Sequence, residues 1–193
     1  MAFSPSGASR SLLPLPKMRT IPASLKSLTG AAWNRWWQTL RLWAIRLCSR
    51  TGKTRQEAEP DAVDNVLRHG LARYLSQEHL QCLRQVRIGV AGAGGLGSNA
   101  ALMLVRSGVG KLLLLDDDVV DASNLNRQQY WPRHVGQPKV DALAELLREL
   151  DPDLDLDVRR LRLTADNLPH ILPLCPVWVE ALDGTEDKRL LVE

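Results

Sequence analysis

The residues best suited to chemistry are the glycines of the stretch Gly92-Ala93-Gly94-Gly95-Leu96-Gly97. A Gly-x-Gly-x-x-Gly motif between a strand and a helix places nucleotide phosphates against the backbone. Gly92 permits the tight turn, Gly94 lets a phosphate come close, and Gly97 lets helix and strand pack tightly. The unpaired N–H groups at the start of the helix, together with its dipole, favour an anion. The motif, with Gly95 inside it, therefore predicts a nucleotide site. The alternative is a glycine turn that serves packing alone.

A polar loop downstream supplies further groups of the same chemistry. Asp116 follows Gly92 at about the spacing at which an acid meets a ribose hydroxyl in dinucleotide-binding folds. Asn124, Arg127 and Gln128 then add two amides and a cation. A dehydrogenase needs one acid in this region and little more, so the extra groups favour another use of the nucleotide.

Two more charged residues follow. Lys139 comes at the end of Gly136-Gln137-Pro138-Lys139, and Asp183 follows an apolar run near the end of the sequence. Arg127 and Lys139 could neutralise charge that grows on a polyphosphate, and Asp183 could hold Mg²⁺. These residue types predict phosphoryl chemistry, with the two cations as catalytic residues.

The elements that must position these groups alternate along the chain. Apolar runs predict strands at 86–91, 111–115 and 176–182, and a weak alternation predicts another at 155–163. Helices are predicted after the glycines, from Pro138, and at 166–172. Short helices are expected at 61–70 and from Ser76, which suits an N-cap. Strand and helix in alternation predict an α/β fold, a Rossmann-like doubly wound and mainly parallel sheet. The carboxyl ends of its strands would form the ligand crevice.

The sequence divides into two parts. Residues 1–60 form a basic extension that we expect to be disordered apart from an amphipathic, Trp-rich helix at 31–48. That helix suits a membrane surface, a partner protein or a transit peptide, and the alternative is a poorly ordered extension. Residues 61–193 form the nucleotide-binding domain. The sequence stops inside the helix expected after the last strand, so we expect a domain truncated at its C-terminus.

Composition excludes several classes of function. Residues 1–56 hold ten of the 25 Lys and Arg residues and none of the 22 Asp and Glu, so the remainder is acidic and suits no nucleic-acid partner. No apolar run is long enough to span a membrane. The three scattered cysteines form no Cys-x-x-Cys pair, so no zinc site is visible, and we expect reduced thiols in a cytoplasmic protein.

Taken together, these motifs resemble the ThiF/MoeB/HesA adenylyltransferases, relatives of ubiquitin-activating enzymes, in the branch linked to thiamine biosynthesis. The resemblance covers about residues 70–193 and rests on Gly92–Gly97, Asp116-x-Asp118, Ser123-Asn124-Leu125-Asn126-Arg127-Gln128, Gly136-Gln137-Pro138-Lys139 and Asp183.

This resemblance implies ATP and Mg²⁺ as cofactors, a ubiquitin-like sulfur carrier protein as partner, and a homodimer. The carrier's C-terminal glycine carboxylate would attack the α-phosphate and release pyrophosphate. The implied roles are phosphate contact for Gly94, Gly95, Asn124, Arg127 and Lys139, ribose binding for Asp116, and Mg²⁺ binding for Asp183. Gln128 belongs to the same nucleotide-binding set.

Three departures from the family pattern matter. Ser76 stands where the family often has an arginine that is donated across a dimer. The sequence ends before the region in which many relatives have paired zinc cysteines and a sulfur-handling cysteine, and Glu186-Asp187 follow Asp183 where Asp-Asn is common. Two other functions remain open: a nicotinamide-dependent oxidoreductase on the same fold, and an inactive, truncated nucleotide-binding module.

Overall fold

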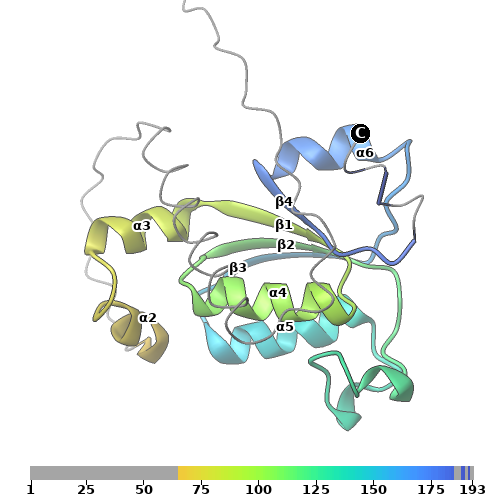
Figure 1. The fold of residues 1–193 in the computed structure, drawn as a ribbon, viewed down its shortest axis with the longest axis horizontal. Helices are drawn as coiled ribbons and strands as arrows, with labels where there is room; N and C mark the ends of the chain where they lie inside the picture. Colours follow the sequence, from red (N-terminus) through yellow and green to blue (C-terminus); the bar gives the residue numbers. More distant parts are fainter. Residues whose placement is uncertain (1–64, 185–187, 190, 192–193) are drawn as a thin grey trace, which may run out of the picture.

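The computed structural model describes residues 65–184, 188, 189 and 191 (Figure 1). The extension expected at 1–60, its amphipathic helix and residues 185–187 lie outside the described residues. Within them, four strands form one sheet: β1 (Arg87–Ala91), β2 (Lys111–Leu115), β3 (Asp155–Arg159) and β4 (Val177–Glu180). All three strand pairs are parallel, in the order β3-β2-β1-β4. The expected α/β, Rossmann-like parallel sheet is confirmed.

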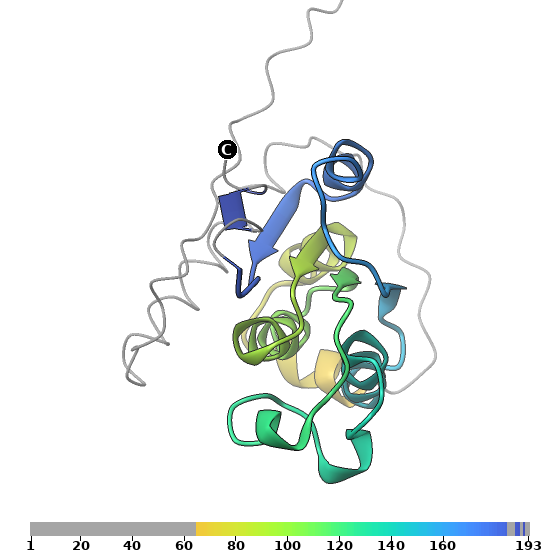
Figure 2. The ribbon, with the colours of Figure 1, turned by 90° about the vertical axis from the view of Figure 1, so that its right-hand side faces the viewer.

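The helices cover both faces of this sheet. The α-helices are α2 (Val66–Leu71), α3 (Gln77–Gln85), α4 (Gly95–Arg106), α5 (Lys139–Leu150) and α6 (Leu168–Ile171). Short 3-10 turns are η2 (Ala122–Asn124), η3 (Pro132–His134) and η4 (Leu172–Leu174). Helices α4 and α5 lie side by side on one face and α6 lies on the other, as the end-on view of Figure 2 shows.

Strand β2 shows why the sheet is covered on both sides. Its leucines alternate between the two hydrophobic clusters: Leu112 and Leu114 pack on the side of α4 and α5, while Leu113 and Leu115 pack on the side of α6. All four are at most 1% exposed. An unbroken apolar run is the pattern of a strand buried on both faces, because successive side chains point to opposite faces.

Several predicted boundaries differ in the structure. The third strand ends at Arg159 rather than Leu163, because the chain leaves the sheet there and Leu163 packs into the cluster beneath α6. The helix expected at 166–172 is one short turn, Leu168–Ile171, with Pro169 in its first turn. Ser76 caps α3 as predicted, accepting the N–H of His79 on its side-chain oxygen at 3.3 Å.

Polar contacts join helices α2 and α3 to the end of α5 that lies farthest from the glycine turn. Asn65 Nδ2 donates to Asp151 Oδ1 at 2.7 Å, and the Arg84 guanidinium lies 3.4 Å from the other Asp151 oxygen. Asp151 is only 1% exposed, so its charge depends on these partners.

The structure also bears on the state of the thiols and on membrane-spanning helices. Cys175 is a free, buried thiol, as expected, whereas Cys82 is disulfide-bonded, so the expectation of reduced thiols is wrong at this position. Among the helices of the described residues, none has the length and apolarity that crossing a bilayer requires.

Candidate nucleotide site

The glycine turn lies where the order of the strands reverses. Strand β1 leads through α4 to β2 on one side, while β4 pairs with the other edge of β1. In open parallel sheets, ligands bind outside the carboxyl ends of the strands at this switch point. The turn follows β1, and Asp183 follows β4, so in this parallel sheet both lie at the same end.

Gly92 and Gly97 are required by close packing. Gly92 has a φ of +99°, and a Cβ there would overlap the Ala181 carbonyl. A Cβ on Gly97 would overlap the carbonyl oxygen of Gly92. The first and last glycines therefore allow the strand to turn tightly and the helix to approach it, which are the two roles expected of them.

Gly94 and Gly95 have open space instead. A Cβ on Gly94 would lie 3.9 Å from Gln128 Nε2 and 4.0 Å from Asp183 Oδ2, and one on Gly95 would lie 3.6 Å from the Arg127 carbonyl oxygen. The bare backbone of Gly94 is thus flanked by the Gln128 amide and the Asp183 carboxylate. Gln128 is 8% exposed, and its Oε1 is buried without a hydrogen-bond partner, which marks a polar group suited to a ligand.

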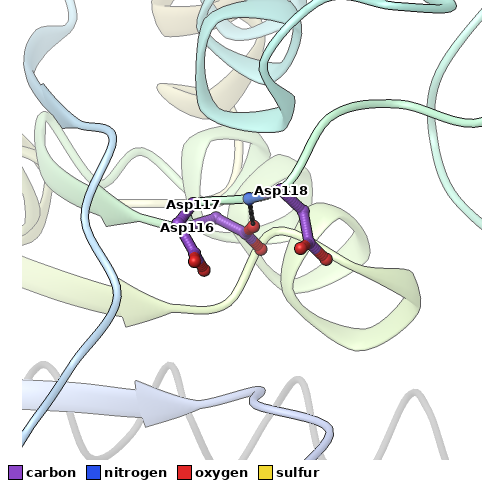
Figure 3. A group of neighbouring side chains, drawn as sticks. All are labelled: Asp116, Asp117 and Asp118. Atoms are coloured by element: carbon purple, nitrogen blue, oxygen red, sulfur yellow. Dashed lines mark hydrogen bonds between the residues drawn. The ribbon is translucent and has the colours of Figure 1, made fainter.

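Asp116 is held by the backbone at the exit of β2. Its Oδ2 accepts the N–H of Ala93 at 2.6 Å, and its Oδ1 accepts the N–H of Asp118 at 2.8 Å. Figure 3 shows Asp116, Asp117 and Asp118 together, with carboxylate oxygens within 4.8 Å of one another. Because each Asp116 oxygen keeps a further lone pair, the side chain can still accept hydrogen bonds from ribose hydroxyls.

Lys139 opens α5 and is the buried cation of the site. Its side chain is 8% exposed, and its Nζ lies 2.6 Å from Asp118 Oδ2. Its backbone N–H also donates to the Asp118 carbonyl oxygen at 2.9 Å. The ammonium has three donors and Asp118 uses one, so the others can meet an incoming anion.

A pocket of about 270 Å³ joins these groups at the carboxyl ends of the strands. Among the residues predicted from the sequence, it is lined by Gly92, Gly94, Asp116, Lys139 and Asp183. Residues that the sequence did not single out also line it: Leu161, Arg162, Leu163 and Leu182. Three of them come from the stretch after β3, which leaves the sheet earlier than predicted.

Five predicted residues do not line the pocket: Gly95, Gly97, Asn124, Arg127 and Gln128. Two of them, Arg127 and Asn124, lie on the loop after β2. The exposed Arg127 guanidinium donates to the Ser123 carbonyl oxygen at 2.9 Å and to Asn126 Oδ1 at 3.0 Å. Asn124 Oδ1 accepts the N–H of Asp121 at 3.0 Å and so caps η2. Both side chains are engaged within their own loop, so reaching a phosphate would require them to turn.

Sequence reasoning missed Tyr130, which connects two parts of the site. Its hydroxyl donates to the carbonyl oxygen of Ala93 at 2.6 Å, and the carbonyl oxygen of Lys139 lies 3.2 Å away. Burial, reinforced by the Asp116 charge, raises the pKa of Tyr130 far above its ordinary value, so the hydroxyl stays a donor. Tyr130 sits in a polar stretch without periodicity, so nothing in the pattern marked it.

A glycine turn, an acid at the exit of the second strand and a buried lysine meet at the switch point of a parallel sheet, which is the arrangement typical of nucleotide-binding α/β domains. The chain belongs to the ThiF family, whose sequence profile matches residues 67–193. This match confirms the resemblance at the level of the family, and the branch linked to thiamine biosynthesis stays a prediction.

Individual relatives share only part of their length with this chain. It is 40% identical to ubiquitin-like modifier-activating enzyme 5 of Xenopus laevis over 96 residues, which cover 49% of this chain and 24% of that protein. It is 42% identical over 110 residues to "adenylyltransferase and sulfurtransferase uba4" of Aspergillus terreus, covering 56% of this chain and 23% of that protein. The chain thus spans about a quarter of the length of these relatives.

A solved structure that contains a nucleotide is also similar. It is E. coli tRNA N6-threonylcarbamoyladenosine dehydratase in complex with ATP, with a TM-score of 0.62 and 32% sequence identity. The match covers 64% of this chain and 52% of that one. The fold described above therefore occurs in a protein that binds ATP.

Proposed function

We propose that this chain binds ATP and adenylylates the C-terminal glycine carboxylate of a ubiquitin-like sulfur carrier protein. The observation that carries the proposal is the pocket in which Gly94, Asp116, Lys139 and Asp183 meet. The names of the relatives, a ubiquitin-like modifier-activating enzyme and an adenylyltransferase, support a protein carboxylate as the nucleophile. Sulfur transfer of the thiamine type is the finer part of the proposal.

The chemistry needs positioning and charge neutralisation more than a protein nucleophile. A carboxylate oxygen of the carrier attacks the α-phosphorus, an acyl-adenylate bond forms, and the bond to the β-phosphate breaks, so that pyrophosphate leaves. Asp116 binds the ribose and the bare backbone of Gly94 and Gly95 admits the phosphates. Lys139 and, after its loop turns, Arg127 stabilise the charge that develops, while Asn124 contacts the phosphates and Gln128 belongs to the nucleotide-binding set.

A divalent cation fits the same crevice. Asp183 is exposed, lines the pocket and lies beside Gly94, and carboxylate oxygen is the ligand that Mg²⁺ prefers. When bound there, Mg²⁺ supplies positive charge to the phosphate oxygens. We propose Asp183 as its protein ligand.

Family membership favours this function over the nicotinamide-dependent oxidoreductase, which has no use for a buried lysine beside the glycine turn. A homodimer and a cytoplasmic location remain parts of the proposal, the second because the reaction consumes ATP. The inactive, truncated module is the outcome that the following experiment must exclude.

The test is ATP–pyrophosphate exchange with the full chain, with and without a carrier that ends in Gly-Gly. We expect exchange that requires the carrier and is lost when its final glycine is removed. Lys139→Ala and Arg127→Ala should each lower the exchange rate by about 10²–10³-fold, the cost of removing one group that stabilises transition-state charge.

Matched controls come from cations far from the pocket. Lys111 opens β2 at the opposite end of the sheet, and Arg148 lies near the end of α5, so Lys111→Ala and Arg148→Ala should leave exchange unchanged. Exchange that survives both Lys139→Ala and Arg127→Ala would contradict the roles of these cations. Absence of exchange, or exchange stimulated by tRNA instead of the carrier, would overturn the carrier as substrate.

A further inference from the structure

The side chain of Tyr130 joins the glycine turn to the start of helix α5. Tyr130 is 5% exposed, and its ring meets the ring of His134 edge-on with centroids 6.2 Å apart. Its hydroxyl reaches the Ala93 carbonyl oxygen, inside the glycine motif, and the carbonyl oxygen of Lys139. One buried side chain therefore spans the two segments that face the pocket.

The two contacts of the Tyr130 hydroxyl differ in strength. A phenol has one proton, so the 2.6 Å contact to Ala93 is the hydrogen bond and the 3.2 Å contact to Lys139 is its longer branch. The Lys139 carbonyl lies in the first turn of α5, where the helix supplies another donor. The Lys139 carbonyl oxygen therefore does not need the Tyr130 hydroxyl as its donor. The contact instead links the glycine turn to the start of the helix.

The Lys139 side chain is fixed to the exit of β2 by Asp118. Lys139 is held at its N–H by the Asp118 carbonyl and at its Nζ by the Asp118 carboxylate, both on the β2 side. The glycine turn is held on the same side by Asp116, which accepts the Ala93 N–H, and Tyr130 reaches the Ala93 carbonyl oxygen. Among the described residues, the Tyr130 hydroxyl is the side-chain group that contacts the backbone of both Ala93 and Lys139.

We infer that Tyr130 is a positioning residue that holds the Lys139 ammonium at the correct distance from phosphates bound over the glycine turn. This inference rests on the proposed binding of ATP, and it does not depend on which carboxylate is activated. Tyr130 itself touches neither the nucleotide nor the reacting atoms, since its hydroxyl points to two backbone carbonyls and is buried.

The test is a double-mutant cycle read by nucleotide binding. Calorimetry gives the affinities of the full chain, as wild type, Tyr130→Phe, Lys139→Ala and the double variant, for ATP and for adenosine. Tyr130→Phe should weaken ATP binding by about three- to tenfold, the range of one hydrogen bond, and leave adenosine binding unchanged. In the Lys139→Ala background, the same change should cause no further loss.

The second tyrosine of the chain provides the matched control. Tyr74 is 78% exposed, so Tyr74→Phe should leave both affinities at their wild-type values. Circular dichroism checks folding of each variant. If Tyr130→Phe does not fold, Tyr130→Leu removes the same donor while keeping an apolar side chain, and completes the cycle.

The outcomes separate this inference from the proposed function. Equal losses for ATP and adenosine, a loss that persists without Lys139, or no loss at all would each overturn the positioning role. A wild-type chain that binds no ATP would overturn the proposed function itself. ATP binding without carrier-dependent exchange would contradict adenylylation while the cycle still tests Tyr130.

Discussion

The Lys139 ammonium lies 2.6 Å from the Asp118 carboxylate, and the two side chains differ sharply in exposure, at 8% and 63%. The pair therefore has one buried member whose charge depends on an exposed partner. Removing the partner of a buried charge costs more than the pair itself contributes. ATP, if it binds as proposed, would bring a second anion to the same ammonium.

Asp118→Asn should therefore destabilise the protein in the absence of nucleotide. We expect a loss of about 1–3 kcal/mol in the free energy of unfolding, because the buried ammonium keeps only a neutral acceptor. With saturating Mg-ATP, the loss should shrink, since the triphosphate neutralises Lys139. Urea unfolding with and without ATP measures both values. Asp166→Asn, at an exposed acid before α6, is the control, and a loss that ATP does not alter would contradict the prediction.

Alanine at two glycines should separate packing from binding. Gly97→Ala places a Cβ onto the Gly92 carbonyl and should lower the free energy of unfolding by about 1–3 kcal/mol, the cost of overpacking. Gly94→Ala has room for its methyl group between Gln128 and Asp183, so stability should change by less than about 0.5 kcal/mol. ATP affinity should nevertheless fall about tenfold or more, because the methyl group occupies the space where a phosphate approaches the backbone.

Thermal unfolding and calorimetric titration of ATP test this pair. Gly136→Ala is the control for ATP binding, because Gly136 lies outside the pocket; its φ of +87° makes a stability loss expected there too. A Gly94→Ala variant that binds ATP as the wild type does would contradict phosphate contact at Gly94.

Acid should unfold the protein partly through Asp157. Its hydrogen bonds with Arg159 and its proximity to Arg87 lower the pKa of Asp157 below the ordinary value of 3.8. Between these two values, the unfolded chain binds more protons than the folded one, so stability rises with pH. The contribution is fully present above about pH 4 and is lost as pH falls through the folded value.

Asp157→Asn should therefore lower the free energy of unfolding at pH 7 and flatten its pH dependence below about pH 4. Urea unfolding from pH 3 to pH 7 measures this dependence. Asp155→Asn, on the same strand but 65% exposed, is the control. A variant with the wild-type acid dependence would show that another carboxylate is responsible.

Cys175 should be chemically inert in the folded protein. Burial raises the pKa of its thiol from 9.0 to about 11, so little thiolate is present at pH 8. We expect slow alkylation by iodoacetamide in the native protein and fast alkylation in urea, followed by mass spectrometry of the peptide that contains Cys175. Rapid labelling of the native protein at pH 8 would mean that this thiol is exposed to solvent.

The fold and the centre of the site could be predicted from the sequence because both depend on local signals. The unbroken apolar run at Leu112–Leu115 predicted a strand covered on both faces, and the glycine spacing predicted the turn that Gly92 makes. The parallel direction of the strands follows from the alternation of these elements, because parallel strands need crossover connections, whereas the strand order is known from the structure. Asp116, Lys139 and Asp183 then meet because each follows a strand or opens a helix at the same end of the sheet.

The remainder of the site depends on tertiary contacts that leave no local pattern. Tyr130 acts through two backbone carbonyls from distant segments, and Leu161 reaches the pocket because the chain leaves β3 early. The Arg127 guanidinium is held by hydrogen bonds within its own loop, an orientation that residue type alone does not predict. Sequence patterns predict which groups are available, whereas packing decides where each one points.

The pairing of β1 with β4 has a consequence for how the protein matures. Ile88 pairs with Val177, and Gly92 packs against Ala181, so the turn acquires its neighbour only when the last of the four strands arrives. A nascent chain that has emerged from the ribosome as far as β3 would carry every glycine of the motif but no crevice. The crevice is therefore completed only with the last of the four strands, and the ATP binding proposed above would report that this strand has joined the sheet.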